Sequence, residues 1–160
     1  MIQAITETNL EINIQTEDNR IDTSVASTQI RHLFKFTNDM DKSVYYAYAF
    51  IENIKARFTE ALFVYNSTTN LYSGRINFLP SGYWKYEVYE VSWLGDVTIT
   101  ETTAPRTETD VLTPPSASKG VVQGLVTKGK MYVSDNAGTE QVQYTQRQEP
   151  AASNYIYYGQ

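Results

Sequence analysis

The fold is decided by Ser81–Trp93, SGYWKYEVYEVSW, which packs two Trp, three Tyr and two Val into one short run. Aromatic and β-branched residues at this density indicate a central β-strand. The apolar residues occupy even positions first and odd positions afterwards: Trp84, Tyr86 and Val88, then Tyr89, Val91 and Trp93. Side chains of a strand alternate between its two faces, so this change of phase predicts a bulge, or a strand that leaves one sheet for another, near Val88 and Tyr89.

The entry to this strand, residues 78–82 (FLPSG), has the Pro and Gly of a turn. A Pro/Gly turn that delivers Trp84, Tyr86 and Val88 to one face resembles the corner that opens strand F of immunoglobulin-like sandwiches. In that corner a ring is buried with its polar end bonded to nearby backbone. The resemblance implies a fold and leaves the function open.

Composition excludes several classes of function. The 160 residues suit one ordinary domain, or a domain of about 100 residues with an appendage. A formal net charge of −5 argues against binding of nucleic acid or an anionic membrane, since both need clustered Lys and Arg. The chain has no cysteine for a disulfide, a thiolate metal site or a nucleophile. We expect neither a membrane span nor a secretion signal, because the sequence lacks about 18 consecutive apolar residues and a basic N-terminal start.

Other stretches alternate as half-buried strands do, at residues 9–15 and 29–37. Residues 53–66 fit an amphipathic helix as well as a strand, and the β-branched and aromatic residues of their second half favour the strand. Further strands are predicted at residues 43–51, 71–79 and 97–101. The whole indicates an all-β fold, an antiparallel immunoglobulin-like β-sandwich over residues 1–101. Its predicted core includes six inward side chains: Ile12, Phe34, Phe36, Trp84, Tyr86 and Val88.

The remainder of the chain is predicted to form two further parts. Residues 102–119 contain three Pro and much Thr and Ser, which indicates a semi-extended linker. Residues 120–160 are predicted to be a small C-terminal β module with strands at 121–127, 130–134, 140–146 and 154–158. A β module of about 40 residues rarely buries enough apolar surface to be stable alone, so it is expected to pack on the first module or on another chain.

Two patterns could carry chemistry, and each has a simpler interpretation. His32 is the only histidine and lies on the inward face of a strand, which favours a hydrogen-bonded core residue over a catalytic one. Residues 124–130 (GLVTKGK) match the start of a phosphate-binding loop, but Met131 stands where that loop needs Ser or Thr. We therefore favour a turn at Gly129 and Lys130 between two strands.

The remaining candidates also favour structural roles. The turn with Asn38, Asp39 and Asp41 lacks the Gly and Glu of a calcium loop, and Asn66-Ser67-Thr68 is interpreted as a plain loop, although it fits a glycosylation acceptor. Glu87 and Glu90, imagined as a glycosidase pair, point to opposite faces unless a bulge realigns them. Trp84 and Trp93 could stack on sugars, but core and interface positions are favoured. We therefore expect no catalytic residue, metal or cofactor, and no enzyme activity.

Several stretches taken in order carry a resemblance to a protein family: NDMD, SVYYAYAF, RFTE, SGYWKYEVYEVSW, TETDVLTPP, KGVVQGLVTKGKMYV and EQVQYTQ. Together they resemble small virion structural proteins of tailed bacteriophages, in particular phages of Bacteroidetes hosts that include the crAss-like group. The resemblance implies a β-sandwich with a β tail, present in many copies on a capsid or tail. It also implies assembly in the host cytoplasm and location in the virion.

The leading hypothesis is an auxiliary capsid (head decoration) protein that packs on the major capsid protein or other virion proteins, and on copies of itself. It predicts no partner among nucleic acids or membranes. The side chains predicted to make these contacts, with packing inside the chain as the alternative, are Val111, Leu112, Met131, Tyr132, Tyr155, Ile156, Tyr157 and Tyr158. The alternatives are a head-fibre or tail protein that binds host glycan through exposed rings, a head-tail connector component and, ranked last, a hydrolase.

Overall fold

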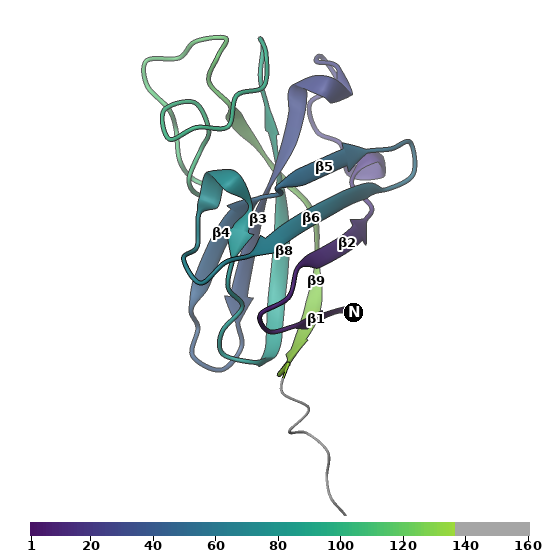
Figure 1. The fold of residues 1–160 in the computed structure, drawn as a ribbon. Coiled ribbons are helices and arrows are strands. Elements are labelled where there is room, and N and C mark those ends of the chain that lie inside the picture. The colour runs from purple at the N-terminus through teal and green to yellow at the C-terminus, as the bar shows by residue number, and fades with distance from the viewer. Residues whose placement is uncertain (137–160) are drawn as a thin grey trace, which may run out of the picture.

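The computed structural model describes residues 1–136, and these form two β-sheets with almost no helix (Figure 1). The first sheet has the strand order β1-β9-β8-β3-β4, and the second has the order β2-β6-β5 with the short β7 beside β6. The strands are β1 (Ile2–Ile5), β2 (Leu10–Ile14), β3 (Ile30–Asn38), β4 (Val44–Tyr48), β5 (Ile51–Ile54), β6 (Thr59–Tyr65), β7 (Arg75–Ile76), β8 (Gly82–Ser92) and β9 (Val121–Ser134). Three single-turn 3-10 helices are η1 (Glu17–Asn19), η2 (Ser27–Gln29) and η3 (Leu71–Ser73).

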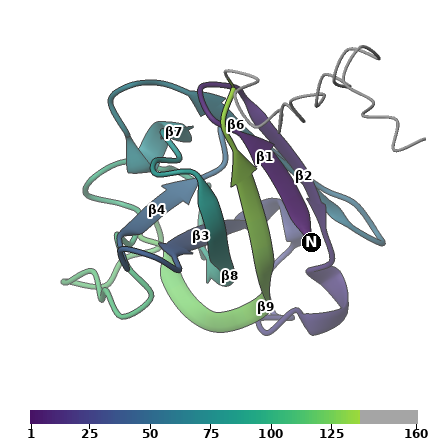
Figure 2. The ribbon, with the colours of Figure 1, turned by 90° about the horizontal axis from the view of Figure 1, so that it is seen from below.

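The main core lies between the two sheets, whose arrangement Figure 2 shows from below the view of Figure 1. Phe34 and Phe36 of β3 meet Phe63 of β6 edge to face, with ring centroids 4.9 and 5.5 Å apart. Phe78 packs edge to face on Phe36 and on Trp84. Edge-to-face pairs are a favoured arrangement of aromatic rings, so this cluster joins the two layers in a chain without disulfides.

A bulge is present at the predicted position, but its extra residue lies in β9. β8 itself pairs with β3 without a register shift across Val88 and Tyr89. The pairing of β8 with β9 shifts register between Val88 and Tyr89, and again between Glu90 and Val91. Trp84 and Val88 pack in the main core, whereas Val91 packs in a second cluster on the other face of the sheet. At the entry to β8 the Trp84 ring is buried, and its Nε1 donates to Pro80 O at 3.1 Å.

The alternating stretches form strands as predicted. β2 buries every second residue, and β3 lies antiparallel between β8 and β4. Of the six predicted core residues, Tyr86 is half-buried, and the other five are buried: Ile12, Phe34, Phe36, Trp84 and Val88. The second half of residues 53–66 is the strand β6, so the strand was the correct choice there. Residues 71–79 differ from the prediction, because they hold η3 and only the two-residue β7.

The C-terminal part of the fold differs from the predicted division. Residues 121–134 form one strand, β9, which pairs with β8 and, in parallel, with β1. They therefore belong to the first sheet and are not a separate module. The predicted turn at Gly129 and Lys130 is wrong. Gly129 lies opposite Tyr86 in the register, and an added Cβ would lie 2.5 Å from Tyr86 Oη, so glycine here makes room for a ring. The predicted strands at 140–146 and 154–158 lie outside the described residues.

The connection from β8 to β9, residues 93–120, is folded back onto the first sheet at one end of the strands (Figure 1). It contains no strand at residues 97–101, which corrects that prediction. Nor are residues 102–119 a linker, because Ala104 is buried in the second cluster with Tyr48 and Trp93. Tyr48 Oη donates to Pro105 O at 2.8 Å. Polar composition concealed this packing, since only a few of its side chains are buried.

Candidate docking groove

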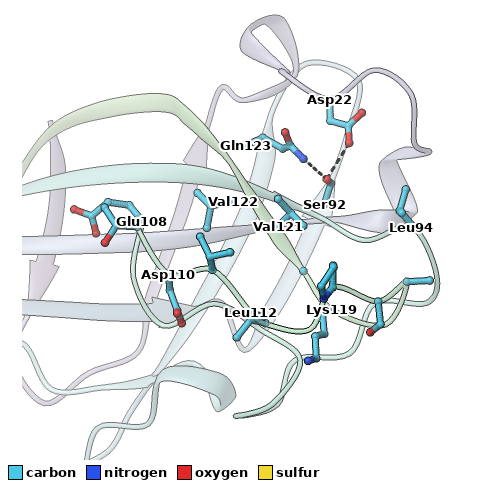
Figure 3. Close-up of a pocket in the computed structure, with 16 residues that line it drawn as sticks. Asp22, Ser92, Leu94, Glu108, Asp110, Leu112, Lys119, Val121, Val122 and Gln123 are labelled. Carbon is cyan, nitrogen blue, oxygen red and sulfur yellow. Dashed lines mark hydrogen bonds between the residues drawn. The ribbon is translucent and has the colours of Figure 1, made fainter.

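A cavity of about 610 Å³ lies between the β8–β9 connection and the first residues of β9 (Figure 3). Its apolar lining comes from Val111 and Leu112 of the connection, from Val121 and Val122 of β9, and from Leu94. Backbone contacts fix the wall: Gly95 N donates to Ala117 O and Gly120 N donates to Thr103 O. The cavity therefore has one wall from the β8–β9 connection and one from β9, and we call it the docking groove.

The rim of the docking groove is the most exposed apolar surface at this end of the molecule. The exposed fractions are 78% for Val111, 74% for Leu94 and 57% for Val121. Leu112 is half-buried in the wall. Sequence reasoning singled out Val111 and Leu112 but missed Leu94 and Val121, whose exposure depends on how the connection folds back.

Polar side chains line one side of the groove. Figure 3 shows Gln123 and Asp22 converging on Ser92. Gln123 Nε2 donates to Ser92 Oγ at 2.8 Å, and Ser92 Oγ donates to Asp22 Oδ2 at 2.9 Å. Hydrogen bonds from Ser24 and from Ser92 hold the pKa of Asp22 below its usual value. A carboxylate stabilised in this way is a weak base, so the arrangement orders Ser92 without activating it as a nucleophile.

A second polar group clamps the connection to the sheet. Glu108 of the connection meets Lys35 Nζ and Tyr46 Oη, each at 2.5 Å. The hydrogen bond with Glu108 raises the pKa of Lys35, and burial together with the Glu108 contact raises the pKa of Tyr46 to about 12. Burial raises the pKa of Glu108, but the hydrogen bonds from Lys35 and Tyr46 outweigh it and leave that pKa below its usual value. The clamp holds the groove wall in place.

The other predicted contact residues fall in different places. Met131 is fully buried, so its predicted interface role is wrong: it is the inward cross-strand partner of Trp84. Tyr132 faces outward beside Tyr83, with the two ring centroids 5.0 Å apart. The remaining four, Tyr155, Ile156, Tyr157 and Tyr158, lie outside the described residues.

His32 is buried as a hydrogen-bonded core residue, which agrees with the favoured interpretation. Its Nδ1 lies 2.6 Å from Glu52 Oε1, and its backbone N donates to Glu52 Oε2 at 3.2 Å. Both side chains are 2% exposed, and neither lines the docking groove. The pair joins β3 of the first sheet to β5 of the second. The sequence did not identify Glu52, because the two residues come together only through the stacking of the sheets.

The acidic candidates are occupied by local hydrogen bonds. Asn38 Oδ1 accepts from the backbone of Met40 and Asp41, as in a polar turn. Within residues 1–136, no group of three His, Cys, Asp or Glu side chains is placed to hold a metal ion. Asn66 Oδ1 accepts from Thr68 N inside its loop.

The aromatic and carboxylate pairs in β8 are also structural. Glu90 is buried and accepts hydrogen bonds from the backbone N of Ile21 and Asp22, at 3.0 and 2.7 Å. Glu87 lies on the other face, 3.6 Å from Lys35. Trp84 and Trp93 are fully buried, so neither ring is available to stack on a sugar. No helix in the described part of the chain is long and apolar enough to cross a membrane.

Comparison of the chain with protein-family models, with curated proteins and with solved structures finds no match.

Proposed function

We propose that this chain is an auxiliary capsid (head decoration) protein of a tailed bacteriophage, and that it binds the major capsid lattice through the docking groove. The observation that carries the proposal is the exposed apolar rim formed by Leu94, Val111 and Val121 around a built cavity. Exposed apolar patches rimmed by polar groups mark interaction sites in soluble domains. The sequence resemblance supplies the class of partner.

The proposal includes a finer description of the fold, an immunoglobulin-like sandwich. The order β2-β6-β5 corresponds to strands B, E and D of that fold, and the order β9-β8-β3-β4 corresponds to G, F, C and C′. The buried ring of Trp84 bonded to Pro80 O is in the place of the corner that opens strand F. Such sandwiches present loops at the ends of their strands, and the docking groove is built from such a connection.

The proposed mechanism is burial of apolar area across capsid subunits. An apolar side chain of the lattice enters the groove between Leu112 and Val122, and the rim closes around it. Full burial of a Val or Leu side chain contributes about 1.5–3 kcal/mol. Each contact is weak by itself, but several copies around one capsomer, in contact with one another, raise the effective affinity by multivalency.

Co-sedimentation with capsids assembled from the major capsid protein tests the proposal. We expect Val111→Asp and Leu94→Asp each to lower the apparent affinity for capsids at least tenfold. Each substitution removes the burial of one apolar side chain, about 1.5–3 kcal/mol, and a tenfold change in affinity corresponds to about 1.4 kcal/mol. Met40→Asp is the matched control, since Met40 is 76% exposed in a turn away from the groove and does not line it. Its affinity should equal that of the wild type.

Two results contradict the proposal. Failure of the folded wild-type chain to bind capsids rules out the decoration role, and binding to portal or tail assemblies instead indicates a connector or tail role. The glycan-binding alternative depended on an exposed row of rings including Trp84 and Trp93. Both are buried, so we do not advance it.

A further inference from the structure

The outer surface of the first sheet carries a cluster that the docking groove does not use. Beyond the part covered by the β8–β9 connection, Lys85, Lys128 and Lys130 lie exposed on one face of β8 and β9, with Tyr83 and Tyr132 next to them. We call these five residues the lysine face. Figures 1 and 2 show the two strands side by side along their length.

One pair of these lysines is unfavourable for the isolated chain. Lys85 and Lys130 are direct cross-strand partners, and like charges in that position destabilise a sheet. Lys85 Nζ lies 3.3 Å from Asp39 Oδ1 at the edge of the face. Among the described residues, no carboxylate lies within ion-pair distance of Lys128 or Lys130. In a chain with a net charge of −5, this concentration of positive charge needs an explanation other than composition.

The aromatic end of the face adds contact area. Tyr83 is 55% exposed, and its ring is tilted against that of Tyr132. A hollow of about 470 Å³ lies next to them and is lined by Gln3, Ile5 and Tyr132. Tyrosine is enriched in protein interfaces, where it supplies a large area together with a polar end.

We infer that the lysine face binds an acidic, extended segment of a partner protein. Lys128 and Lys130 are two residues apart on one strand, which sets their Cα atoms about 6.6 Å apart. A peptide in the extended conformation with a carboxylate at every second residue has the same spacing, so successive carboxylates meet successive lysines. An apolar side chain of that segment then reaches the hollow beside Tyr132.

A polynucleotide fits the same face less well. Glu87 lies directly opposite Lys128 in the register and would repel a continuous row of phosphates. The net negative charge of the chain also opposes the approach of a long polyanion. A short segment with a few discrete carboxylates carries less charge than a polynucleotide, so both repulsions are smaller for it. The inference stands on the lysine face alone and does not depend on the capsid proposal.

Heteronuclear NMR titration of the full chain with a 12-residue peptide of alternating Glu and Thr tests the inference. We expect amide shifts that cluster at Lys85, Lys128 and Lys130 and that weaken with salt. The triple variant Lys85→Gln, Lys128→Gln, Lys130→Gln should bind at least tenfold more weakly. Its matched control removes the same number of charges from the second sheet and its loops: Lys55→Gln, Arg57→Gln, Arg75→Gln. The control should bind as the wild type does.

The design distinguishes the possible occupants. A peptide of alternating Gln and Thr should cause no shifts, because it lacks the carboxylates. Absence of shifts with the Glu peptide at millimolar concentration overturns the inference, as does equal weakening in the triple variant and its control. Tighter binding of a thymidine hexanucleotide to the same amides also overturns it, in favour of a nucleic-acid site. The spectrum of each variant should resemble that of the wild type, which shows that the variant is folded and that weaker peptide binding is not caused by unfolding.

Discussion

Replacement of Glu108 by Gln should release the β8–β9 connection from the sheet. Glu108 accepts two hydrogen bonds, from Lys35 Nζ and Tyr46 Oη, and its side chain is 22% exposed. Glutamine has nearly the same shape, but its amide carries no charge and has only one acceptor oxygen. The variant therefore removes the ion pair and one acceptor without leaving a cavity.

The size of the effect follows from the two contacts. A hydrogen bond to a charged group contributes about 1.5–3 kcal/mol when it is well shielded. Solvent reaches about a fifth of this site, and Glu87 lies 3.6 Å from Lys35 and remains as a partner. We therefore expect Glu108→Gln to lower the free energy of unfolding by about 1–2 kcal/mol at neutral pH.

The contribution of Glu108 to the free energy of unfolding should depend on pH. The pKa of Glu108 is lowered from 4.5 in the folded chain, so the folded state favours the charged carboxylate. A group of this kind contributes stability that is present above pH 4.5 and is lost as the pH falls through the folded pKa. The difference between wild type and Glu108→Gln should therefore shrink toward zero as the pH falls below the folded pKa of Glu108, where the wild-type carboxyl becomes neutral.

Urea unfolding followed by Trp fluorescence measures the effect, since Trp93 is buried beneath the connection. Glu101→Gln is the matched control, because Glu101 lies in the same connection but is 71% exposed in its pair with Arg106, and we expect no measurable change. Hydrogen exchange should show loss of protection for residues 104–110 in Glu108→Gln only. A loss that persists undiminished in acid, or one equal to that of the control, refutes the clamp.

Three further substitutions test the packing. The cost given for each is the decrease in the free energy of unfolding, measured from the midpoint of urea unfolding. Gly120→Ala should cost about 1–3 kcal/mol, because the added Cβ would lie 2.6 Å from the buried Trp93 ring, and a neutral result contradicts that packing. Tyr48→Phe should cost about 1–2 kcal/mol by leaving Pro105 O without its donor; unchanged hydrogen exchange in the connection would argue against this contact. Trp84→Phe should cost roughly 2 kcal/mol through the lost bond to Pro80 O and a small cavity, unless the corner is not a stabilising element.

The local sequence pattern was sufficient to predict a strand wherever that strand buries one of its faces. β2 and β3 alternate apolar and polar residues over most of their length, and each alternation is a direct consequence of having one face in the core. These features need no knowledge of the partner strand.

Features that depend on distant partners were missed. β1 is a four-residue edge strand whose partner, β9, lies about 130 positions away, and its sequence shows no strong alternation. In β9 the glycine at 129 suggested a turn, but it is there because the Tyr86 ring occupies the space of a side chain. The connection looked like a linker because a small number of contacts hold it, among them the clamp of Glu108, the buried Ala104 and the hydrogen bond from Tyr48 to Pro105 O.

The residues of the candidate site could be predicted from the sequence only in part. Val111 and Leu112 stand out as apolar residues in a polar stretch, and they line the docking groove. Met131 stands out equally but points inward, because its position in β9 is set by pairing with Trp84 of β8. Exposure of an apolar residue in a strand depends on the phase of that strand, whereas in a tightly bent loop it depends on tertiary contacts that the sequence does not display.

The single strand β9 carries both proposed binding surfaces, and this constrains how they can work together. Val121 at the groove and Lys128 in the lysine face lie opposite Ser92 and Glu87 of β8, which are five residues apart, so they are separated by about 17 Å along the sheet. A standard interface covers about 800 Å² per partner, a patch roughly 30 Å across, so one partner can contact both surfaces at once. Between these two residues β9 is paired with β8 alone, because β1 pairs only with residues 131–134. The pairing with β8 therefore sets the separation of the two surfaces, and a partner that uses both must match it. Substitutions that separate the two contacts must therefore be placed at outward positions of β9, because inward residues such as Gly129 and Met131 would change the sheet that sets the distance.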